Sequence, residues 1–262
     1  MTILEEIAEH TLVRVKKAKE QISEEEMKAK AYALKDDSFL FENALKGKKL
    51  GFICECKKAS PSKGVIAKEF DYLSIAKEYE AAGADAISVL TEPEWFLGSD
   101  TYLREIAAAV KIPCLRKDFT VDKYMIYEAK VLGASAVLLI CSLLSDSQLK
   151  EYIDICDDLG LSALVETHDE AEIKRALSAK ARIIGVNNRN LKDFTVNTKN
   201  SQKLRSLVPD DVIFVSESGI SDAKDIKDLY DIGVNAVLVG ETMMRASDKK
   251  AKLTELKEGI SL

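Results

Sequence analysis

Proline and glycine are scarce in this chain of 262 residues, with 4 and 12 copies respectively. Such low numbers exclude collagen-like repeats and low-complexity linkers. Hydrophobic residues make up 47% of the chain, which is enough to build a sizeable core and excludes an intrinsically disordered protein. The sequence therefore predicts a globular protein, and with no linker to divide it we expect a single domain over 1–262.

Cysteine and histidine are too few and too scattered for a disulfide framework or a zinc site. There are two histidines and five cysteines, an odd number. They form no C-x-x-C pair, although Cys54 and Cys56 stand two residues apart. We therefore expect buried thiols, no metal and no bound cofactor.

Long apolar runs and excess positive charge are also missing. No uncharged apolar stretch reaches the roughly 18 residues of a membrane span. The opening MTILEEIAEH lacks the basic start and apolar stretch of a signal peptide, which predicts a cytoplasmic protein. The net charge of −6 argues against nucleic acid but allows a small anion in a locally basic cleft.

Eight short apolar runs alternate with helical stretches from residue 49 to 262. Four of them follow a glycine placed just after a predicted helix, as in AAGADAI and VLGASAV, which indicates repeated strand–helix units. Eight units of this size predict a (β/α)8 TIM barrel. The alternative is a doubly wound open sheet, which would usually show a glycine-rich fingerprint after the first strand, where KKASPSKG stands instead. The predicted strands are 50–55, 85–90, 112–117, 136–140, 162–166, 182–187, 212–217 and 236–240.

Residues 1–48 precede the barrel and are predicted to be helical. We expect an extension that packs over one end or side of the barrel, with a regulatory arm as the alternative. Its apolar positions are Ile3, Leu4, Ile7, Leu12, Val13, Leu34, Phe39 and Leu40.

Polar side chains stand at the ends of five predicted strands. Side chains alternate along a strand, so Glu55 and Lys57 share the face of Ile53 and point into the barrel mouth. The neighbouring cysteines then face the helices. Burying one charge can be structural, but gathering several at one mouth is costly without a function. The candidate catalytic residues are Lys57, Lys117, Glu55, Glu166, Asn187 and Glu217.

Two glycine-containing loops follow the seventh and eighth strands, where barrels commonly bind phosphate. They read SESGIS (216–221) and VGET (239–242). Gly219 and Gly240 would let the backbone approach an anion, and Ser218 adds a hydroxyl donor.

Two further loops allow two interpretations each. The segment 60–64, SPSKG, is either a closing lid or a solvated turn. Trp95 and Phe96 form either an aromatic wall or ordinary packing. His168 is expected to be a solvated loop residue, and Arg189 lies within reach of a carboxylate.

Seven segments together resemble the indole-3-glycerol-phosphate synthase family of tryptophan biosynthesis. They are ECKKASPSKG, LTEPEWFLGS, LRKDF, LVETHDEAE, IGVNNRNL, SESGI and LVGETMMR, spread in order from residue 55 to 245. The resemblance implies a barrel lyase, free of cofactors, that acts on 1-(2-carboxyphenylamino)-1-deoxyribulose 5-phosphate. Ring closure, decarboxylation and dehydration would give indole-3-glycerol phosphate, carbon dioxide and water.

The resemblance also implies roles for individual residues. Lys117 would be the general acid and Glu166 the base of dehydration, while Lys57 would lie near substrate anions or assist proton transfer. Glu55 and Asn187 would orient these groups, and Glu217 would hold a substrate hydroxyl. The phosphate would lie against Ser218, Gly219, Gly240 and the backbone of Glu241. The anthranilate ring and its carboxylate would contact Phe96, Phe119, Leu138, Ser60 and Arg189.

Two other functions stay open from the residues alone. One is another phosphosugar enzyme, either an isomerase or an aldolase with Lys117 or Lys57 as a Schiff base. The other is a barrel that binds a sugar phosphate without catalysis. In each case we expect a small phosphorylated ligand and a monomer.

Overall fold

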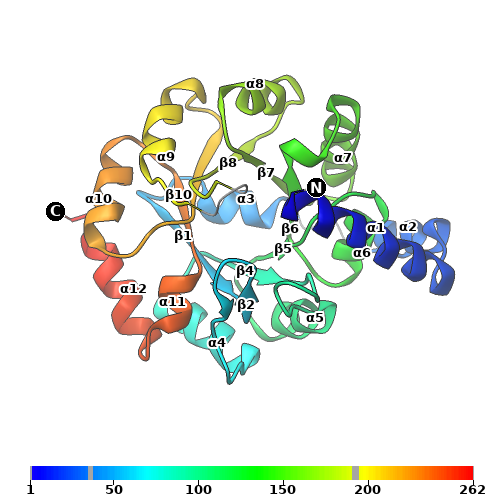
Figure 1. Cartoon of the computed structure of the whole chain (residues 1–262), viewed down its shortest axis with the longest axis horizontal. Coiled ribbons are helices and arrows are strands. Elements are labelled where there is room, and N and C mark those ends of the chain that lie inside the picture. Colours follow the sequence, from blue (N-terminus) through cyan, green and yellow to red (C-terminus); the bar gives the residue numbers. More distant parts are fainter. Residues whose placement is uncertain (1, 35–37, 191–194, 262) are drawn as a thin grey trace.

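Eight parallel strands form a closed barrel in the computed structural model, which describes residues 2–34, 38–190 and 195–261 (Figure 1). The last strand pairs with the first, with Gly51 opposite Ala236, so no barrel edge is left open. This confirms the predicted TIM barrel, and the doubly wound sheet is wrong. The barrel strands are β1 (Gly51–Cys56), β4 (Ala86–Leu90), β5 (Cys114–Lys117), β6 (Ala136–Ile140), β7 (Ser162–Thr167), β8 (Ile183–Asn187), β9 (Ile213–Glu217) and β10 (Ala236–Val239).

Helices surround the barrel (Figure 1). Gly83, Gly133, Gly160 and Gly233 follow four of them with φ between 65° and 89°, so each predicted glycine takes the left-handed conformation that ends a helix. The helices of the ring are α4 (Tyr72–Ala82), α5 (Asp100–Ala109), α6 (Tyr124–Val131), α7 (Asp146–Asp158), α8 (Glu170–Ser178), α9 (Lys199–Leu204), α10 (Ala223–Asp231), α11 (Glu241–Arg245) and α12 (Lys249–Glu258).

Alternation along the strands creates two apolar layers. On β1, Ile53 belongs to the cluster inside the barrel, whereas Phe52, Cys54 and Cys56 belong to the layer between strands and helices. All five cysteines are described and are buried free thiols. Burial raises the pKa of Cys54 to about 12, so this thiol stays protonated and acts as packing, as predicted.

The N-terminal segment contributes α1 (Ile3–Gln21), α2 (Glu24–Tyr32) and α3 (Leu40–Leu45). Helix α1 contributes to the cavity at the barrel mouth, while Phe41 and Leu45 of α3 join the cluster inside the barrel. The segment thus reaches more of the barrel than the single end or side that we expected. Four of its apolar positions are 47–54% exposed: Leu12, Val13, Leu34 and Leu40.

The segment after β1 forms a small antiparallel hairpin of β2 (Ala59–Ser60) and β3 (Gly64–Val65). The backbone N–H of Ala59 donates to Phe96 O at 3.2 Å, which joins the hairpin to the loop after β4. Within the segment 60–64, Ser60 and Gly64 pair with each other and residues 61–63 form the turn between them, so the segment is the turn of this hairpin. Among the described residues, no helix combines the length and the apolar character that a membrane span needs.

Candidate active site

A cavity of about 700 Å³ opens at the carboxyl ends of the strands. All the residues that the sequence singled out as catalytic, substrate-binding or phosphate-binding line it. They are Glu55, Lys57, Ser60, Phe96, Lys117, Phe119, Leu138, Glu166, Asn187, Arg189, Glu217, Ser218, Gly219, Gly240 and Glu241. The structure thus brings these residues together from the barrel strands and the loops that follow them.

Lys117 lies between two buried carboxylates at the floor of the cavity. Its Nζ is 2.9 Å from Glu166 Oε2 and 3.0 Å from Glu217 Oε2. Burial on its own lowers the pKa of Lys117, but the charges of Glu166, Glu217 and Glu55 outweigh it and raise that pKa well above its usual value. The ammonium is therefore held protonated, as a general acid must be before it acts.

The two carboxylates that face Lys117 differ in acidity. Burial raises the pKa of Glu217 to about 7, and the nearby charges of Glu166 and Glu55 add to that shift. Burial also acts on Glu166, but Lys117, His168 and a hydrogen bond from Asn187 hold the pKa of Glu166 below its usual value. One carboxylate is thus firmly ionised while its neighbour titrates near neutral pH, an arrangement that suits separate proton-transfer roles.

Lys57 and Glu55 form a second ion pair, at 2.7 Å, at the end of β1. Ser88 of β4 donates its hydroxyl to the other oxygen of Glu55 at 3.3 Å. A β-carbon at Gly240 would overlap Glu55 Oε1 and lie 2.8 Å from Lys57 Nζ. Glycine at this position therefore leaves room for the ion pair, a second reason for its place in the loop after β10.

The predicted phosphate loops lie side by side on the same wall of the cavity. Ser218 and Gly219 both have positive φ, 70° and 85°, which turns the backbone sharply after β9. The Thr242 hydroxyl donates to Ile220 O and so ties the start of α11 to this turn. Turned backbone beside the first N–H groups of a helix is a common anion-binding arrangement. Arg245, which the sequence reasoning did not select, also lines the cavity.

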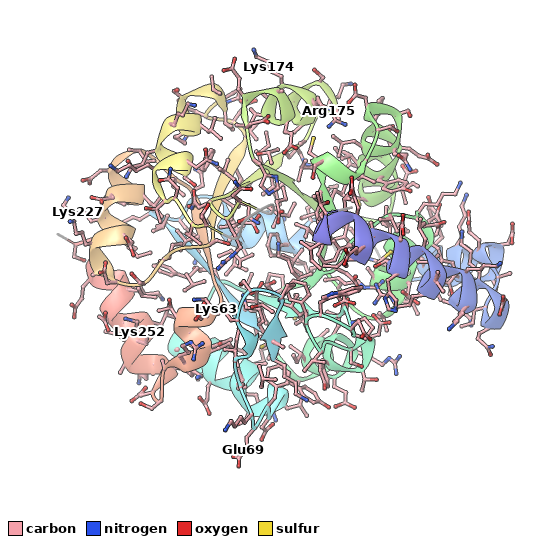
Figure 2. The ribbon with its side chains drawn as sticks, in the orientation of Figure 1. Lys63, Glu69, Lys174, Arg175, Lys227 and Lys252 are labelled. Carbon is pink, nitrogen blue, oxygen red and sulfur yellow. The ribbon has the colours of Figure 1, made fainter. Side chains whose placement is uncertain are left out.

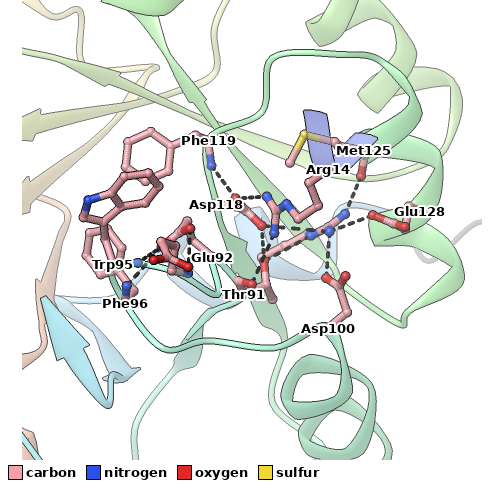
Figure 3. A network of polar contacts seen from close by, with 12 residues as sticks. Arg14, Thr91, Glu92, Trp95, Phe96, Asp100, Asp118, Phe119, Met125 and Glu128 are labelled. Carbon is pink, nitrogen blue, oxygen red and sulfur yellow. Dashed lines mark hydrogen bonds and ion pairs between the residues drawn. The ribbon is translucent and has the colours of Figure 1, made fainter. Parts of the chain in front are cut away.

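An aromatic slot lies opposite, where the rings of Phe96 and Phe119 are 6.0 Å apart. The carboxylate of Glu92 accepts hydrogen bonds from the backbone of Glu94, Trp95 and Phe96, which fixes this loop (Figure 3). Trp95 is not among the cavity-lining residues. It packs edge-on against His10 of α1 at 5.3 Å, so the packing interpretation holds for Trp95 and the wall interpretation fits Phe96.

Helix α1 adds an apolar surface that the sequence did not place at the site. Ile3, Leu4 and Ile7 line the cavity. Arg14 of the same helix donates to Asp118 Oδ1 at 2.7 Å, directly after Lys117 (Figure 3). Burial would raise the pKa of Asp118, but Arg14 and Arg116 outweigh it and hold that pKa below its usual value. The motif LRKDF contained Asp118, yet nothing in the sequence gave it a partner.

The residue before Lys117 anchors the strand from behind. Arg116 is buried and donates to Asp100 and Glu128, both at 2.7 Å, and to Met125 O at 2.9 Å (Figure 3). Asp100 and Glu128 belong to α5 and α6. With Arg116 held on the helix side, alternation along β5 directs Lys117 into the barrel.

The prediction for His168 is wrong. Its side chain is only 20% exposed and lies between two carboxylates, with Nδ1 at 3.2 Å from Glu172 Oε2 and Nε2 at 3.5 Å from Glu166 Oε1. The ring is shielded from solvent because Glu172, in the first turn of α8, contacts both the backbone and the ring of His168. On the neighbouring wall, Asn187 Oδ1 accepts the backbone N–H of Arg189 at 3.0 Å. The segment 191–194, which follows, lies outside the described residues.

The fold alone is shared with distant barrels. A Streptococcus mutans protein named KGPDC superposes with a TM-score of 0.65 over 82% of this chain and 98% of its own, at 14% identity. A structure named 3-hexulose-6-phosphate synthase gives a TM-score of 0.64 over 80% and 99%, at 15% identity.

Full-length relatives are far more similar in sequence. An indole-3-glycerol phosphate synthase of Ruminiclostridium cellulolyticum is 58% identical, covering 97% of this chain and 98% of its own. One of Endomicrobium trichonymphae is 55% identical, covering 98% and 100%. The family model described as indole-3-glycerol phosphate synthase matches residues 4–256. The chain therefore belongs to the indole-3-glycerol phosphate synthase family.

Proposed function

We propose that this chain converts 1-(2-carboxyphenylamino)-1-deoxyribulose 5-phosphate into indole-3-glycerol phosphate, carbon dioxide and water. Membership of the family supports the reaction. The observation that carries the assignment of roles is the Lys117 ammonium, held between Glu166 and Glu217 at the floor of the cavity. No step of this conversion is a net oxidation or reduction, so protein side chains can supply the proton transfers.

Lys117 is the general acid of ring closure. As the ring carbon that bears the carboxylate attacks the ketone carbon, the developing oxyanion takes a proton from Lys117 Nζ. The two carboxylates compensate the lysine charge and keep it protonated in the resting site. Loss of carbon dioxide leaves a hydroxyl group. Lys57, which also lines the cavity, gives this hydroxyl the proton with which it departs as water, while Glu166 takes up a proton from the ring system.

The remaining lining residues bind the two ends of the substrate. The phosphate lies against Ser218, Gly219, Gly240 and Glu241 N–H, beside Lys57. The anthranilate ring lies between Phe96, Phe119 and Leu138, with its carboxylate near Ser60 and Arg189. Glu217, with a pKa of about 7, hydrogen-bonds a sugar hydroxyl as donor or acceptor.

The Schiff-base alternative fits this site less well. An amine must lose its proton before it attacks a carbonyl, whereas the surroundings of Lys117 raise its pKa. Borohydride added with a ketose phosphate would trap a lysine adduct in an aldolase and none in the synthase. A barrel that only binds ligand would show affinity for indole-3-glycerol phosphate without any turnover.

The test follows indole fluorescence in purified protein with the substrate, without added metal or cofactor. We expect a saturable rise, reduced by about 10²-fold or more in Lys117→Ala, the usual cost of a lost general acid. Lys227→Ala is the matched control, because Lys227 pairs with Asp231 on the outer face of α10, far from the mouth (Figure 2). Near-normal turnover of Lys117→Ala would exclude the assigned role.

A further inference from the structure

His168 occupies a defined position between the candidate base and the start of α8. It follows Glu166 by two residues, at the end of β7. Glu172 Oε2 accepts both the backbone N–H of His168, at 2.8 Å, and its ring Nδ1, at 3.2 Å. On the other side of the ring, Nε2 lies 3.5 Å from Glu166 Oε1 and has no hydrogen-bond partner at shorter range.

This geometry fixes where the protons lie on the ring. Nδ1 must carry a hydrogen, because Glu172 Oε2 can only accept. A neutral ring would then turn the lone pair of Nε2 towards another acceptor, Glu166 Oε1. A second proton, on Nε2, removes this conflict and makes the ring an imidazolium that faces one carboxylate on each side.

The charges around the ring favour that imidazolium. Burial alone would lower the pKa of His168, but Glu172, Glu166 and Glu217 outweigh it and raise that pKa above its usual value. Asn200 of α9 donates to His168 O at 3.1 Å. Asp169 and Arg189 line the same cavity as the ring. Among the described residues around the ring, carboxylates thus come from β7, α8 and β9. The cations there are Arg189 and Lys117, and Lys117 already pairs with Glu166 and Glu217.

Helix capping does not explain why this residue is a histidine. At α8, Asp169 accepts the backbone N–H of Glu172, and Glu172 reaches back to His168. Helix α10 begins with the same capping arrangement. There Asp222 accepts the backbone N–H of Asp225, and Asp225 Oδ2 accepts the backbone N–H of Ser221 at 2.8 Å and its hydroxyl at 2.7 Å. A serine is sufficient for the cap, so the imidazole at 168 needs another reason.

We propose that His168, anchored by Glu172, is a positioning residue for Glu166, an inference that rests on the proposed function. Lys117 holds Glu166 Oε2 and the imidazolium holds Glu166 Oε1, so both oxygens of the carboxylate have a cation beside them. The carboxylate plane is thereby fixed, and Glu166 stays ionised until it takes a proton from the intermediate. Glu172 keeps the ring from rotating away.

The first test needs no turnover and therefore stands even if the proposed function fails. The chain has only two histidines, so a protein labelled at the imidazole carbons gives two sets of signals, which His10→Gln assigns. We expect His168 to titrate above 6.5, and Glu166→Gln and Glu172→Gln each to lower its midpoint by about one pH unit. Asp225→Asn, which alters the equivalent cap of α10, is the control and leaves it unchanged. A His168 midpoint at or below 6.5, or one that neither variant moves, would overturn the proposal.

The second test separates positioning from folding. His168→Ser keeps a residue that satisfies the same cap at α10, so we expect it to fold. Its kcat should fall by about tenfold with KM within about twofold, a smaller loss than for a group that itself transfers the proton. The acid limb of its kcat profile should also move to higher pH, since the imidazolium no longer favours ionised Glu166. A wild-type kcat and an unshifted limb in His168→Ser would contradict positioning, whereas an inactive wild type would contradict the proposed function instead.

Discussion

Glu217 of β9 lies against Gly185 of β8, with its carboxylate where a β-carbon would stand. A Cβ built at Gly185 overlaps Glu217 Oε1 and comes within 3.2 Å of both Glu217 Cδ and Leu164 Cδ1. The missing side chain at Gly185 of β8 therefore leaves room for Glu217 of the adjacent β9 to reach Lys117 of β5. The position of the Glu217 carboxylate therefore requires glycine at 185, and substitution of that glycine tests this requirement.

Gly185→Ala should displace Glu217 and reduce kcat by about tenfold or more, since the Lys117–Glu217 contact is lost. Overpacking should also lower the free energy of unfolding by about 1–3 kcal/mol. The measurement is steady-state kinetics with urea unfolding, repeated in a Glu217→Ala background. There the clash is absent, so adding Gly185→Ala should change kcat little. Equal losses in both backgrounds would show that the effect does not run through Glu217.

Arg14→Met should loosen α1 over the cavity, because Asp118 loses its 2.7 Å partner. We expect kcat/KM to fall by about tenfold and the free energy of unfolding by about 1–3 kcal/mol, as for a lost hydrogen bond to a charged group. Arg182→Met is the matched control. Arg182 pairs with Glu42 of α3 at 2.8 Å, so it also secures the N-terminal segment, but away from the mouth. Equal losses of kcat/KM in both variants would show that the loss comes from lower stability and not from a displaced α1 at the cavity.

The raised pKa of Glu217 predicts a pH-dependent stability of definite sign. The folded chain keeps this proton up to about pH 7, whereas the unfolded chain releases it near 4.5. Wild type should therefore lose stability relative to Glu217→Gln as pH rises from about 4.5 to 7, by at most about 3 kcal/mol. Urea unfolding of both proteins at several pH values measures the difference. A constant difference across this range would show that Glu217 titrates normally.

Much of the barrel and its mouth followed from local patterns. Runs of β-branched residues and glycine helix ends predicted the strands, and alternation alone directed Glu55 and Lys57 inward and Cys54 outward. These features depend on a period of two and on helix termini, which are properties of short segments. These features can therefore be predicted without knowledge of the tertiary contacts.

Contacts between distant segments could not be predicted in the same way. The apolar positions of α1 indicated burial but not the partner, so Ile7 was expected to pack while its place over the cavity was missed. Asp118 and Arg14 are 104 residues apart, and neither segment hints at the other. The surroundings of His168 could have been predicted from the sequence. Asp169 followed three residues later by Glu172 is a capping pattern, which places the Glu172 side chain beside His168.

The contacts of α3 also set an order of events during synthesis. Phe41, Glu42 and Leu45 leave the ribosome well before the residues that they contact on β7 and beyond it. Their partners come much later: Ser162, which accepts Glu42 N–H, and Arg182, which is 140 residues further along. The ring closes only when β10 pairs with β1. The polar contacts of Glu42 can thus form only after residue 182 has been made, so α3 completes its docking long after its own synthesis.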